Sequence, residues 1–174
     1  DKIVLLPLGA VEQHGPHLGT GTDTDIVTSL ATAAEMQRQD KIILAPGLPF
    51  GSIHYHLSFG GTISLSADLY VQVVTDLVRS LLQCGFRRII LLNGHGGNIT
   101  PVKMALSILS KAFDHDIPAY IVLATYWELA GSVFSGDTPM ESPALSHACE
   151  YETSLMLHLF PEKVRMENVQ RAVR

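Results

Sequence analysis

Cysteine is scarce in this sequence, and so are long apolar runs and clusters of positive charge. The 174 residues include only two cysteines, Cys84 and Cys149, which is too few for a disulfide scaffold and favours a reduced, cytoplasmic setting. The longest apolar run, near Ala119–Ala124, is far shorter than the roughly 20 residues that a membrane-spanning helix needs. The largest basic cluster is the pair Arg87-Arg88 and the net charge is -5, so we expect no nucleic-acid partner.

The apolar residues that are present are arranged for a folded core. They make up 47% of the chain against 17% charged residues, which excludes a disordered chain and is typical of one domain at this length. Continuous apolar runs alternate with segments of helical periodicity. We expect strands at 3–6, 41–45, 88–92 and 119–124, and helices at 23–39, 67–84, 99–113 and 149–159.

This alternation predicts the fold class. Strands that are apolar throughout indicate a parallel sheet covered by helices on both faces. We therefore expect an α/β fold with three layers, α/β/α, around a mostly parallel sheet. In such folds ligands bind beyond the carboxyl ends of the strands, so the polar loops at those ends are the candidates for chemistry.

The first of these loops offers two carboxylates and two imidazoles. Glu12, His14 and His17 follow the first strand, and Asp23 opens the next helix. Glu12 and His14 are two residues apart, so on an extended backbone both side chains point to one side. Carboxylate oxygen and imidazole nitrogen suit Zn, Mn or Fe. For this loop alone, the alternative is a polar surface turn in which Asp23 caps the helix.

The second loop, Asn93–Asn98, reads NGHGGN between a buried strand and a helix start. Its three glycines permit positive φ and close approach of the backbone to a ligand. Amides at a helix start can bind phosphate, but neither of the usual glycine-rich phosphate patterns is present and no lysine follows. His95, presented by such a turn, fits a metal ligand better.

The third loop, 146–154, leads into the last helix. Glu150 lies in its first turn, where the helix dipole favours a carboxylate in any case, and Glu152 can equally be a buried or a capping carboxylate. His147 is a candidate for proton transfer because imidazole titrates near neutral pH. The alternative for His147 is an ordinary surface histidine.

Weaker candidates lie elsewhere in the chain. Ser52, His54 and His56 stand in the long loop 50–65, and Trp127, the only tryptophan, follows the last strand, where it can line a pocket or fill the core. The pattern G-x-S-x-G is absent, so a serine nucleophile has no support.

Taken together, these stretches resemble the creatininase (creatinine amidohydrolase) family. The matching segments follow the family's order over nearly the whole chain: LGAVEQHGPHL at 8–18, GTDTD at 21–25, GGTISL at 60–65, GFRR at 85–88, NGHGGN at 93–98 and HACEYETS at 147–154. That family includes creatininases, formamide-cleaving deformylases and a peptidase of peptide-cofactor maturation. The resemblance implies a creatininase-like fold and cleavage of a C–N bond at a two-metal site.

The resemblance also implies residue roles. Glu12 and His95 would bind one metal, His14 would bind the other, and Asp23 would bridge the two. His147 matches the family's catalytic histidine. Each ligand would then have an outer partner that orients it.

One position departs from creatininase itself. Creatininase uses a further glutamate two residues after the histidine of the second motif, and here this position is Gly97. The departure resembles the deformylase-like branch of the family. We expect Glu150 to be the replacement metal ligand and to contribute to catalysis. Ser52, Gly96 and Trp127 are expected to contact the substrate.

We therefore predict a metal-dependent amidohydrolase that holds two divalent ions per subunit (Zn, Mn or Fe) and cleaves a C–N bond of a cyclic amide or formamide. A phosphoester hydrolase would need cationic phosphate clamps, which the three clusters lack. The alternative from another class is a catalytically decayed paralogue that binds a small molecule.

The resemblance carries expectations for the whole molecule too. We expect a small-molecule amide as substrate, a homo-oligomer from dimer to hexamer, and neither a membrane nor a nucleic acid as partner. Family members extend beyond both ends of this sequence. Residues 1–174 are therefore expected to form a single domain that is incomplete at its N- and C-termini.

Overall fold

Four parallel strands form the centre of the computed structural model, which describes residues 2–112, 118–134, 140–142 and 145–170. In chain order the strands are β1 (Ile3–Leu8), β2 (Ile42–Leu44), β3 (Arg88–Asn93) and β4 (Tyr120–Thr125). Their order in the sheet is β2-β1-β3-β4, and every neighbouring pair is parallel. The predicted α/β class is thereby confirmed.

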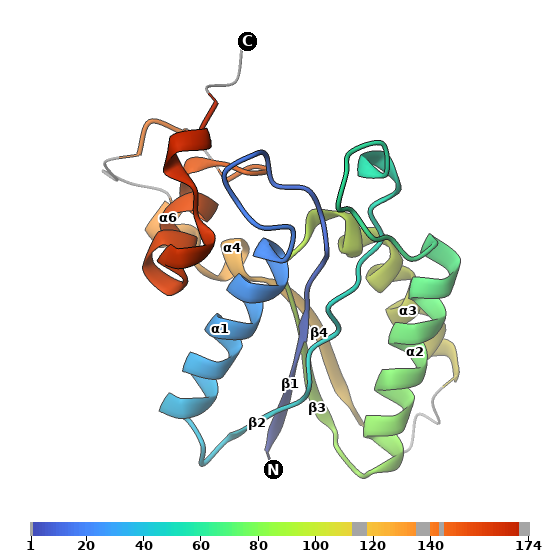
Figure 1. The fold of residues 1–174 in the computed structure, drawn as a ribbon. Coiled ribbons are helices and arrows are strands. Elements are labelled where there is room, and N and C mark those ends of the chain that lie inside the picture. Colours follow the sequence, from blue (N-terminus) through green and yellow to red (C-terminus); the bar gives the residue numbers. More distant parts are fainter. Residues whose placement is uncertain (1, 113–117, 135–139, 143–144, 171–174) are drawn as a thin grey trace.

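Helices cover both faces of this sheet (Figure 1). One face packs against α1 (Thr22–Gln37) and α6 (Glu150–Leu159), and the other against α2 (Ala67–Gln83) and α3 (Ile99–Ala112). Successive residues of β1 pack into two different hydrophobic cores. Leu5 packs in the core under α1 and α6, whereas Leu6 packs in the core under α2 and α3. This is the three-layer arrangement that uninterrupted apolar strands predict.

The predicted elements are all present, with ends that differ by one or two residues. The largest differences are that β1 continues through Pro7 to Leu8 and that α1 ends at Gln37. Residue 113, the predicted end of the third helix, lies outside the described residues. The structure adds two short helices after β4, α4 (Tyr126–Leu129) and α5 (Gly131–Phe134).

Short 3₁₀ turns complete the secondary structure. They span His54–His56, Gly96–Asn98, Pro161–Lys163 and Met166–Asn168. The first of them matters for the site, because it lies in the segment that joins β2 to α2.

The strand order creates a crevice at the carboxyl ends of β1 and β3. The chain leaves β1 through α1 on one face, and leaves β2 through α2 on the other face. Such a reversal of direction is where open α/β sheets bind their ligands. The loops after β1 and β3, which contain the first two histidine motifs, therefore meet at this point.

Gly94 lets α1 begin close to the end of β3. A Cβ atom on Gly94 would lie 2.8 Å from the carbonyl oxygen of Asp23 and 2.8 Å from Val27 Cβ. Contacts that short are not tolerated between real side chains and backbone. The glycine therefore sets how near Asp23 comes to the β3 loop.

The segment between β2 and α2 runs back to the end of the sheet where the carboxyl ends of the strands lie (Figure 1). Isolated parallel bridges join Leu8 to Leu48 and Gly51 to Ser64, and an antiparallel bridge joins Val11 to Ile63. The turn at His54–His56 is thus brought to the carboxyl ends of the strands.

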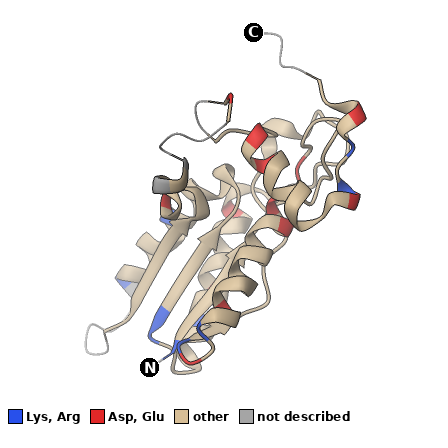
Figure 2. Ribbon diagram, turned by 90° about the vertical axis from the view of Figure 1, so that its left-hand side faces the viewer, with Lys and Arg blue, Asp and Glu red and all other residues tan. Residues whose placement is uncertain are grey.

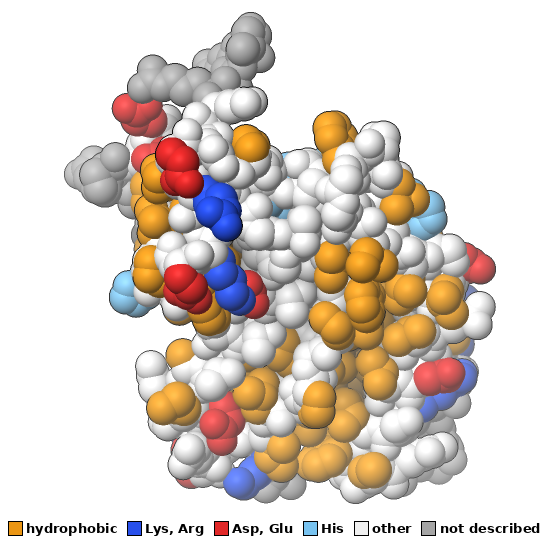
Figure 3. Space-filling view, in the orientation of Figure 1, with side chains coloured by type: hydrophobic (Ala, Val, Ile, Leu, Met, Phe, Trp, Pro, Cys, Tyr) orange, Lys and Arg blue, Asp and Glu red, His pale blue; other side chains and the backbone are white. Residues whose placement is uncertain are grey.

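The surface shows no broad concentration of basic residues among those the structure describes. Figure 2 shows Lys and Arg scattered over both ends of the molecule, mixed with acidic residues. Apolar side chains gather on the face drawn in Figure 3. Large apolar side chains that are exposed in the structure include Phe50, Leu69 and Leu77. Within the described ranges, no helix has the length and apolarity needed to cross a membrane.

Candidate metal centre

Glu12 and His14 turn inward just beyond β1. Their side chains are buried, with exposed fractions of 2% and 1%. His14 Nδ1 donates a hydrogen bond to the backbone carbonyl of Glu12 over 3.0 Å, which fixes the ring and leaves Nε2 directed at the centre of the cluster. This Nε2 lies 3.0 Å from Asp23 Oδ1 and 3.8 Å from Glu152 Oε1.

Asp23, in the first turn of α1, stands between two histidines. Its Oδ1 faces His14, and its Oδ2 lies 2.9 Å from His95 Nδ1. The side chain does not cap α1, because the N-cap residue is Gly21 and no side-chain hydrogen bond is made there. Asp23 is therefore free to use both oxygens toward the cluster.

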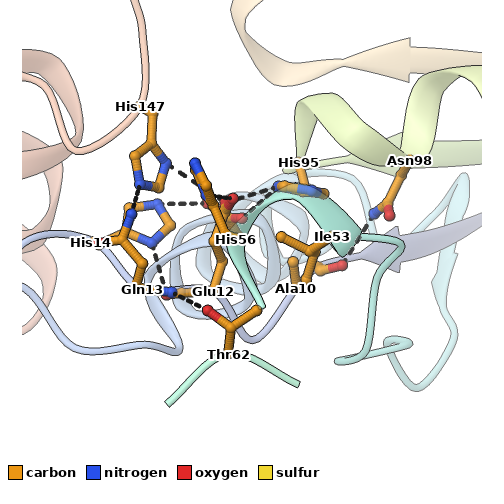
Figure 4. A network of polar contacts seen from close by, with 12 residues as sticks. Ala10, Glu12, Gln13, His14, Ile53, His56, Thr62, His95, Asn98 and His147 are labelled. Atoms are coloured by element: carbon orange, nitrogen blue, oxygen red, sulfur yellow. Dashed lines mark hydrogen bonds and ion pairs between the residues drawn. The ribbon is translucent and has the colours of Figure 1, made fainter. Parts of the chain in front are cut away.

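His95 approaches from the loop after β3 and completes the ring of contacts. Its Nδ1 lies 3.1 Å from Glu12 Oε2 as well as close to Asp23. Its Nε2 points the other way and lies 3.1 Å from the hydroxyl of Tyr55. Figure 4 shows His14 and His95 approaching Glu12 from opposite sides.

Two amide side chains hold the backbone beneath His95. Asn93 donates to the His95 carbonyl over 2.6 Å and accepts from the His95 N–H. Asn98 donates to Asn93 Oδ1 and to the Gly9 carbonyl, and accepts from the Ser52 N–H. The loops after β1, β2 and β3 are thus tied together by one buried network.

Two groups of potential ligands share Asp23. One consists of Glu12, Asp23 and His95, and the other of His14, Asp23 and Glu152; in each, the ligand atoms lie within 4.8 Å of one another. All five side chains are buried. A divalent ion in each group would have Asp23 as a common ligand.

Two atoms of this cluster have ion-pair contacts but no hydrogen bond, and they fit a cation. Among the described residues, His14 Nε2 and Asp23 Oδ2 are buried, lie close to charged partners and make no hydrogen bond. Buried polar atoms without such partners are costly, and a bound cation would satisfy both. Mixed imidazole and carboxylate ligands suit Zn, Mn or Fe.

The electrostatics of the metal-free cluster are strongly coupled. Burial opposes the charged form of His14, but its contacts with Asp23 and Glu152 outweigh burial and raise its pKa to about 11. Burial is likewise outweighed at His95 by Asp23 and Glu12, which raise its pKa to about 9. Without a metal, each histidine therefore keeps a proton that a cation would displace.

A model of a known protein family matches this chain over its whole length. The family model whose description reads "Creatininase: Creatinine amidohydrolase" matches residues 1–174. The chain belongs to the creatininase family.

The curated relatives that this chain matches differ in the substrates that their names state. The chain is 34% identical over 168 residues to the mycofactocin precursor peptide peptidase of Mycobacterium ulcerans, covering 92% of this chain and 60% of that protein. It is 30% identical to the creatinine amidohydrolase of Pseudomonas putida, covering 97% of this chain and 68% of that protein. A 3-dehydro-scyllo-inosose hydrolase of Thermotoga maritima is 30% identical, with 95% and 52% covered.

Solved creatininase structures share the fold. A structure described as "Creatininase Mn" superposes with a TM-score of 0.83 at 29% identity, covering 99% of this chain and 71% of that one. A second, a point mutant of creatininase described as Zn-Zn type, has a TM-score of 0.75 at 30% identity, with 99% and 70% covered. The chain spans about 60% of the length of the mycofactocin peptidases that it matches.

In the third motif, Glu152 rather than Glu150 faces the cluster. Glu150 was expected as the replacement ligand, but its Oε2 accepts a hydrogen bond from the Ser142 N–H over 2.9 Å. Glu152 is 5% exposed and faces His14, while its Oε2 also accepts from the Cys149 N–H. Two residues apart on a helix, the glutamates point in different directions, so only one can reach the site.

His147 lies at the mouth of the cluster. Its Nδ1 is 3.5 Å from Glu12 Oε2, and its ring centroid is 4.4 Å from that of His14. Gln13 Nε2 lies 2.9 Å from His147 Nε2, while Gln13 Oε1 accepts from the Gly15 N–H. The glutamine amide is therefore oriented to donate to His147. Burial, and then the positive charge of His14, lower the pKa of His147.

A cavity of about 260 Å³ opens above these groups. Trp127 and Gly96, both expected at the substrate, line it together with His147. Ser52, the third expected substrate residue, is not among the lining residues; it is 8% exposed and its N–H donates to Asn98 Oδ1.

Tyr55 and His56 are the residues that sequence reasoning undervalued. Both line the cavity, and His56 Nδ1 donates a hydrogen bond to Glu12 Oε1. Glu12, His56 and His147 make up a third group of potential ligands. The only signal in the sequence was a histidine-rich stretch in a long loop, with nothing to show that the loop folds back over the site.

Proposed function

We propose that this chain contains the active site of a metal-dependent amidohydrolase that holds two divalent ions and hydrolyses a C–N bond of a small amide. The observation that carries the proposal is Asp23. It is a buried carboxylate whose two oxygens lie within 3.0 Å of His14 and His95, each of which belongs to a different group of potential ligands.

One ion would be held by Glu12, Asp23 and His95, and the other by His14, Asp23 and Glu152. Glu152 takes the place that we first expected for Glu150. The charges support two ions, because the three carboxylates of these groups would offset most of the charge of two divalent cations. When bound, a pair of ions lowers the pKa of water and polarises the substrate carbonyl.

Hydrolysis of an amide also needs a proton at the departing nitrogen, which is otherwise a poor leaving group. We assign this transfer to His147 Nδ1, the ring atom that faces the carboxylates. Gln13 holds the opposite ring nitrogen, so the imidazole is kept turned toward the cavity. Trp127 and Gly96, which line the same cavity, would contact the substrate.

The size of the cavity supports a small substrate such as a cyclic amide or formamide. A second candidate is the end of a peptide, favoured by the peptidases among the relatives and by a cavity that opens to solvent. A catalytically decayed binding paralogue is opposed by the completeness of the buried ligand set, since burying these groups without use is costly.

The assembly and the cellular setting follow from the same family resemblance and composition. We propose a homo-oligomer, from dimer to hexamer, in the cytoplasm. The two cysteines support a reducing setting, because both are free of disulfides.

The first experiment is metal content followed by substrate screening. Purified, buffer-exchanged protein is analysed by elemental mass spectrometry, reloaded with Zn²⁺ or Mn²⁺, and assayed on formamides, creatinine and other cyclic amides, and short peptides. We expect about two ions per chain and hydrolysis of one substrate class, seen as release of an amine from a formamide or peptide, or as ring opening of a cyclic amide. Protein that takes up neither metal would contradict the proposal.

A further inference from the structure

Two adjacent residues of one short turn, Tyr55 and His56, contact two of the potential metal ligands at atoms that the ligands do not direct at the cluster. Tyr55 places its hydroxyl 3.1 Å from His95 Nε2, and His56 Nδ1 donates to Glu12 Oε1. Both His95 and Glu12 belong to the first group of potential ligands, and neither belongs to the group around His14 and Glu152. The turn His54–His56 therefore contacts one half of the cluster selectively.

The turn is anchored before it reaches these ligands. The Ser52 N–H donates to Asn98 Oδ1 over 3.1 Å, and the Ile53 N–H donates to Ser64 Oγ over 2.7 Å. Ile53 itself is fully buried. A turn that is held by two hydrogen bonds directly before its first residue can fix the direction of its side chains.

Gly97 provides the space for this approach. A Cβ atom there would lie 2.5 Å from the Ser52 carbonyl oxygen, 2.5 Å from His95 Nε2 and 2.8 Å from the Tyr55 hydroxyl. Any side chain at this position would push the turn away from His95. The glycine that departs from the creatininase pattern is thus the one that admits Tyr55.

The direction of the hydrogen bonds follows from what each ligand must present to a cation. A His95 that uses Nδ1 as a ligand has its proton on Nε2, and the Tyr55 oxygen can accept it. A Glu12 that uses Oε2 has Oε1 left over, and the His56 Nδ1–H donates to it. Both contacts leave the ligating atoms free and fix their orientation.

We propose that the turn His54–His56 is an orienting clamp for one of the two ions, the one at Glu12, Asp23 and His95. Tyr55 and His56 are positioning residues in this role, acting through His95 and Glu12. The inference rests on the proposed two-metal function and goes beyond it, because it makes the two ions unequal. The ion at His14 and Glu152 does not depend on the clamp.

The competing interpretation makes His56 a ligand of a third ion, together with Glu12 and His147. Charge opposes it, since three divalent cations would face only three carboxylates in a largely buried space. Counting bound ions separates the two interpretations directly.

The test is a Zn²⁺ titration of the metal-free protein against a competing chelator, with bound metal measured by elemental analysis. We expect two equivalents in the wild type. Tyr55→Phe removes only the hydroxyl, and should weaken one equivalent by about 10- to 100-fold while leaving the other within about twofold. Tyr120→Phe, on an exposed side chain at the start of β4, is the matched control and should change neither.

Ligand variants assign the affected ion. In a Glu152→Gln background only the ion at Glu12 and His95 remains, so Tyr55→Phe should weaken it there. In a His95→Ala background the remaining ion should not respond to Tyr55→Phe. Circular dichroism of each metal-free variant confirms that the fold is kept.

His56 gives an independent check. His56→Ala should weaken the same ion as Tyr55→Phe, and His56→Gln, which keeps a donor N–H, should recover part of the affinity. Equal weakening of both ions, or of neither, would overturn the clamp. Three equivalents in the wild type, one lost in His56→Ala, would overturn it in favour of a ligand role. A wild type that binds no Zn²⁺ at all would instead contradict the two-metal function.

Discussion

At the scale of single residues, the buried charges decide the chemistry. Asp23 is 3% exposed, and an isolated carboxylate at that depth would be strongly destabilising. Burial would raise its pKa, but contacts with His14 and His95 outweigh burial and lower it. The carboxylate is thus kept ionised by the same two histidines that, in our proposal, exchange their protons for metal ions.

Asp23→Asn should therefore remove both ions at once. The amide lacks the charge and offers only one oxygen, so neither group keeps its full ligand set. We expect bound metal to fall from about two equivalents to well under one, measured by elemental mass spectrometry. Asp25→Asn, in the same helical turn but paired with Lys163 outside the cluster, should retain both. Two equivalents in Asp23→Asn would contradict the bridging role.

The raised histidine pKa values predict how the metal-free chain responds to pH. A folded-state pKa of about 11 for His14 and about 9 for His95 means that the folded chain binds protons more tightly than the unfolded chain. This stabilisation is fully present below the ordinary histidine pKa near 6.5 and is lost as pH rises. Between that point and its folded-state pKa, each histidine is expected to lower the free energy of unfolding by about 1.4 kcal/mol per pH unit.

Urea denaturation of chelator-treated protein at pH 6, 7.5 and 9 measures this slope. His14→Gln should flatten it by removing one of the two protons. A free energy of unfolding that stays constant or rises over this range would show that the histidines are not held in the charged form.

Sequence reasoning named most of this cluster, but it chose Glu150 where the structure turns Glu152 toward His14, and the reason is physical. Glu150 and Glu152 share a helical turn and a motif, so residue type alone cannot separate them. The separating signal is periodicity: Glu152 and Met156 are four residues apart and both buried, which marks the inward face of α6. Glu150 lies off that face.

At the scale of elements, uninterrupted apolar runs were sufficient to predict the strands. The face of α2 that is buried could be identified only from the structure. Leu69, Val73, Leu77 and Leu81 stand at four-residue spacing, yet Leu69 and Leu77 are 44% and 37% exposed. The buried row lies one residue further along, at Tyr70, Val74, Val78 and Leu82. Because α2 has two neighbouring apolar rows, sequence alone cannot say which of them meets the sheet.

Packing between α1 and the β3 loop gives a prediction at this scale. Gly94→Ala would place a methyl group 2.8 Å from the Asp23 carbonyl oxygen, so α1 must shift away. Overpacking of this kind costs about 1–3 kcal/mol, and the shift should also reduce metal affinity by moving Asp23. Chemical denaturation and Zn²⁺ titration measure the two effects.

Gly96→Ala is the matched control for Gly94→Ala. It lies two residues away in the same motif, and a Cβ atom there would meet nothing within 4 Å. Stability and Zn²⁺ affinity should stay near wild type. Equal losses in both variants would mean that the motif needs glycine for backbone freedom, not for the approach of α1.

At the scale of the whole molecule, the cluster joins segments that are far apart in sequence. Glu12 and His14 follow β1, Asp23 lies in the first turn of α1, His95 follows β3 and Glu152 lies in α6. The parallel sheet explains why the loop after β1, the start of α1 and the loop after β3 lie together, because the carboxyl ends of parallel strands share one edge of the sheet. The approach of α6 and of the turn His54–His56 depends on tertiary packing, which no local pattern encodes.

Convergence from four segments predicts that metal stabilises the fold as a unit. An unfolded chain cannot hold these ligands together, so an ion that binds only the folded state adds about 2.7 kcal/mol at a free concentration of 100 times its Kd. For a chain of this size that is a rise in Tm of roughly 5–10 °C. Calorimetry of the chelator-treated protein with and without Zn²⁺ measures it. The rise should vanish in Asp23→Asn and survive in Asp25→Asn; a rise of equal size in Asp23→Asn would place the stabilising ion elsewhere in the molecule.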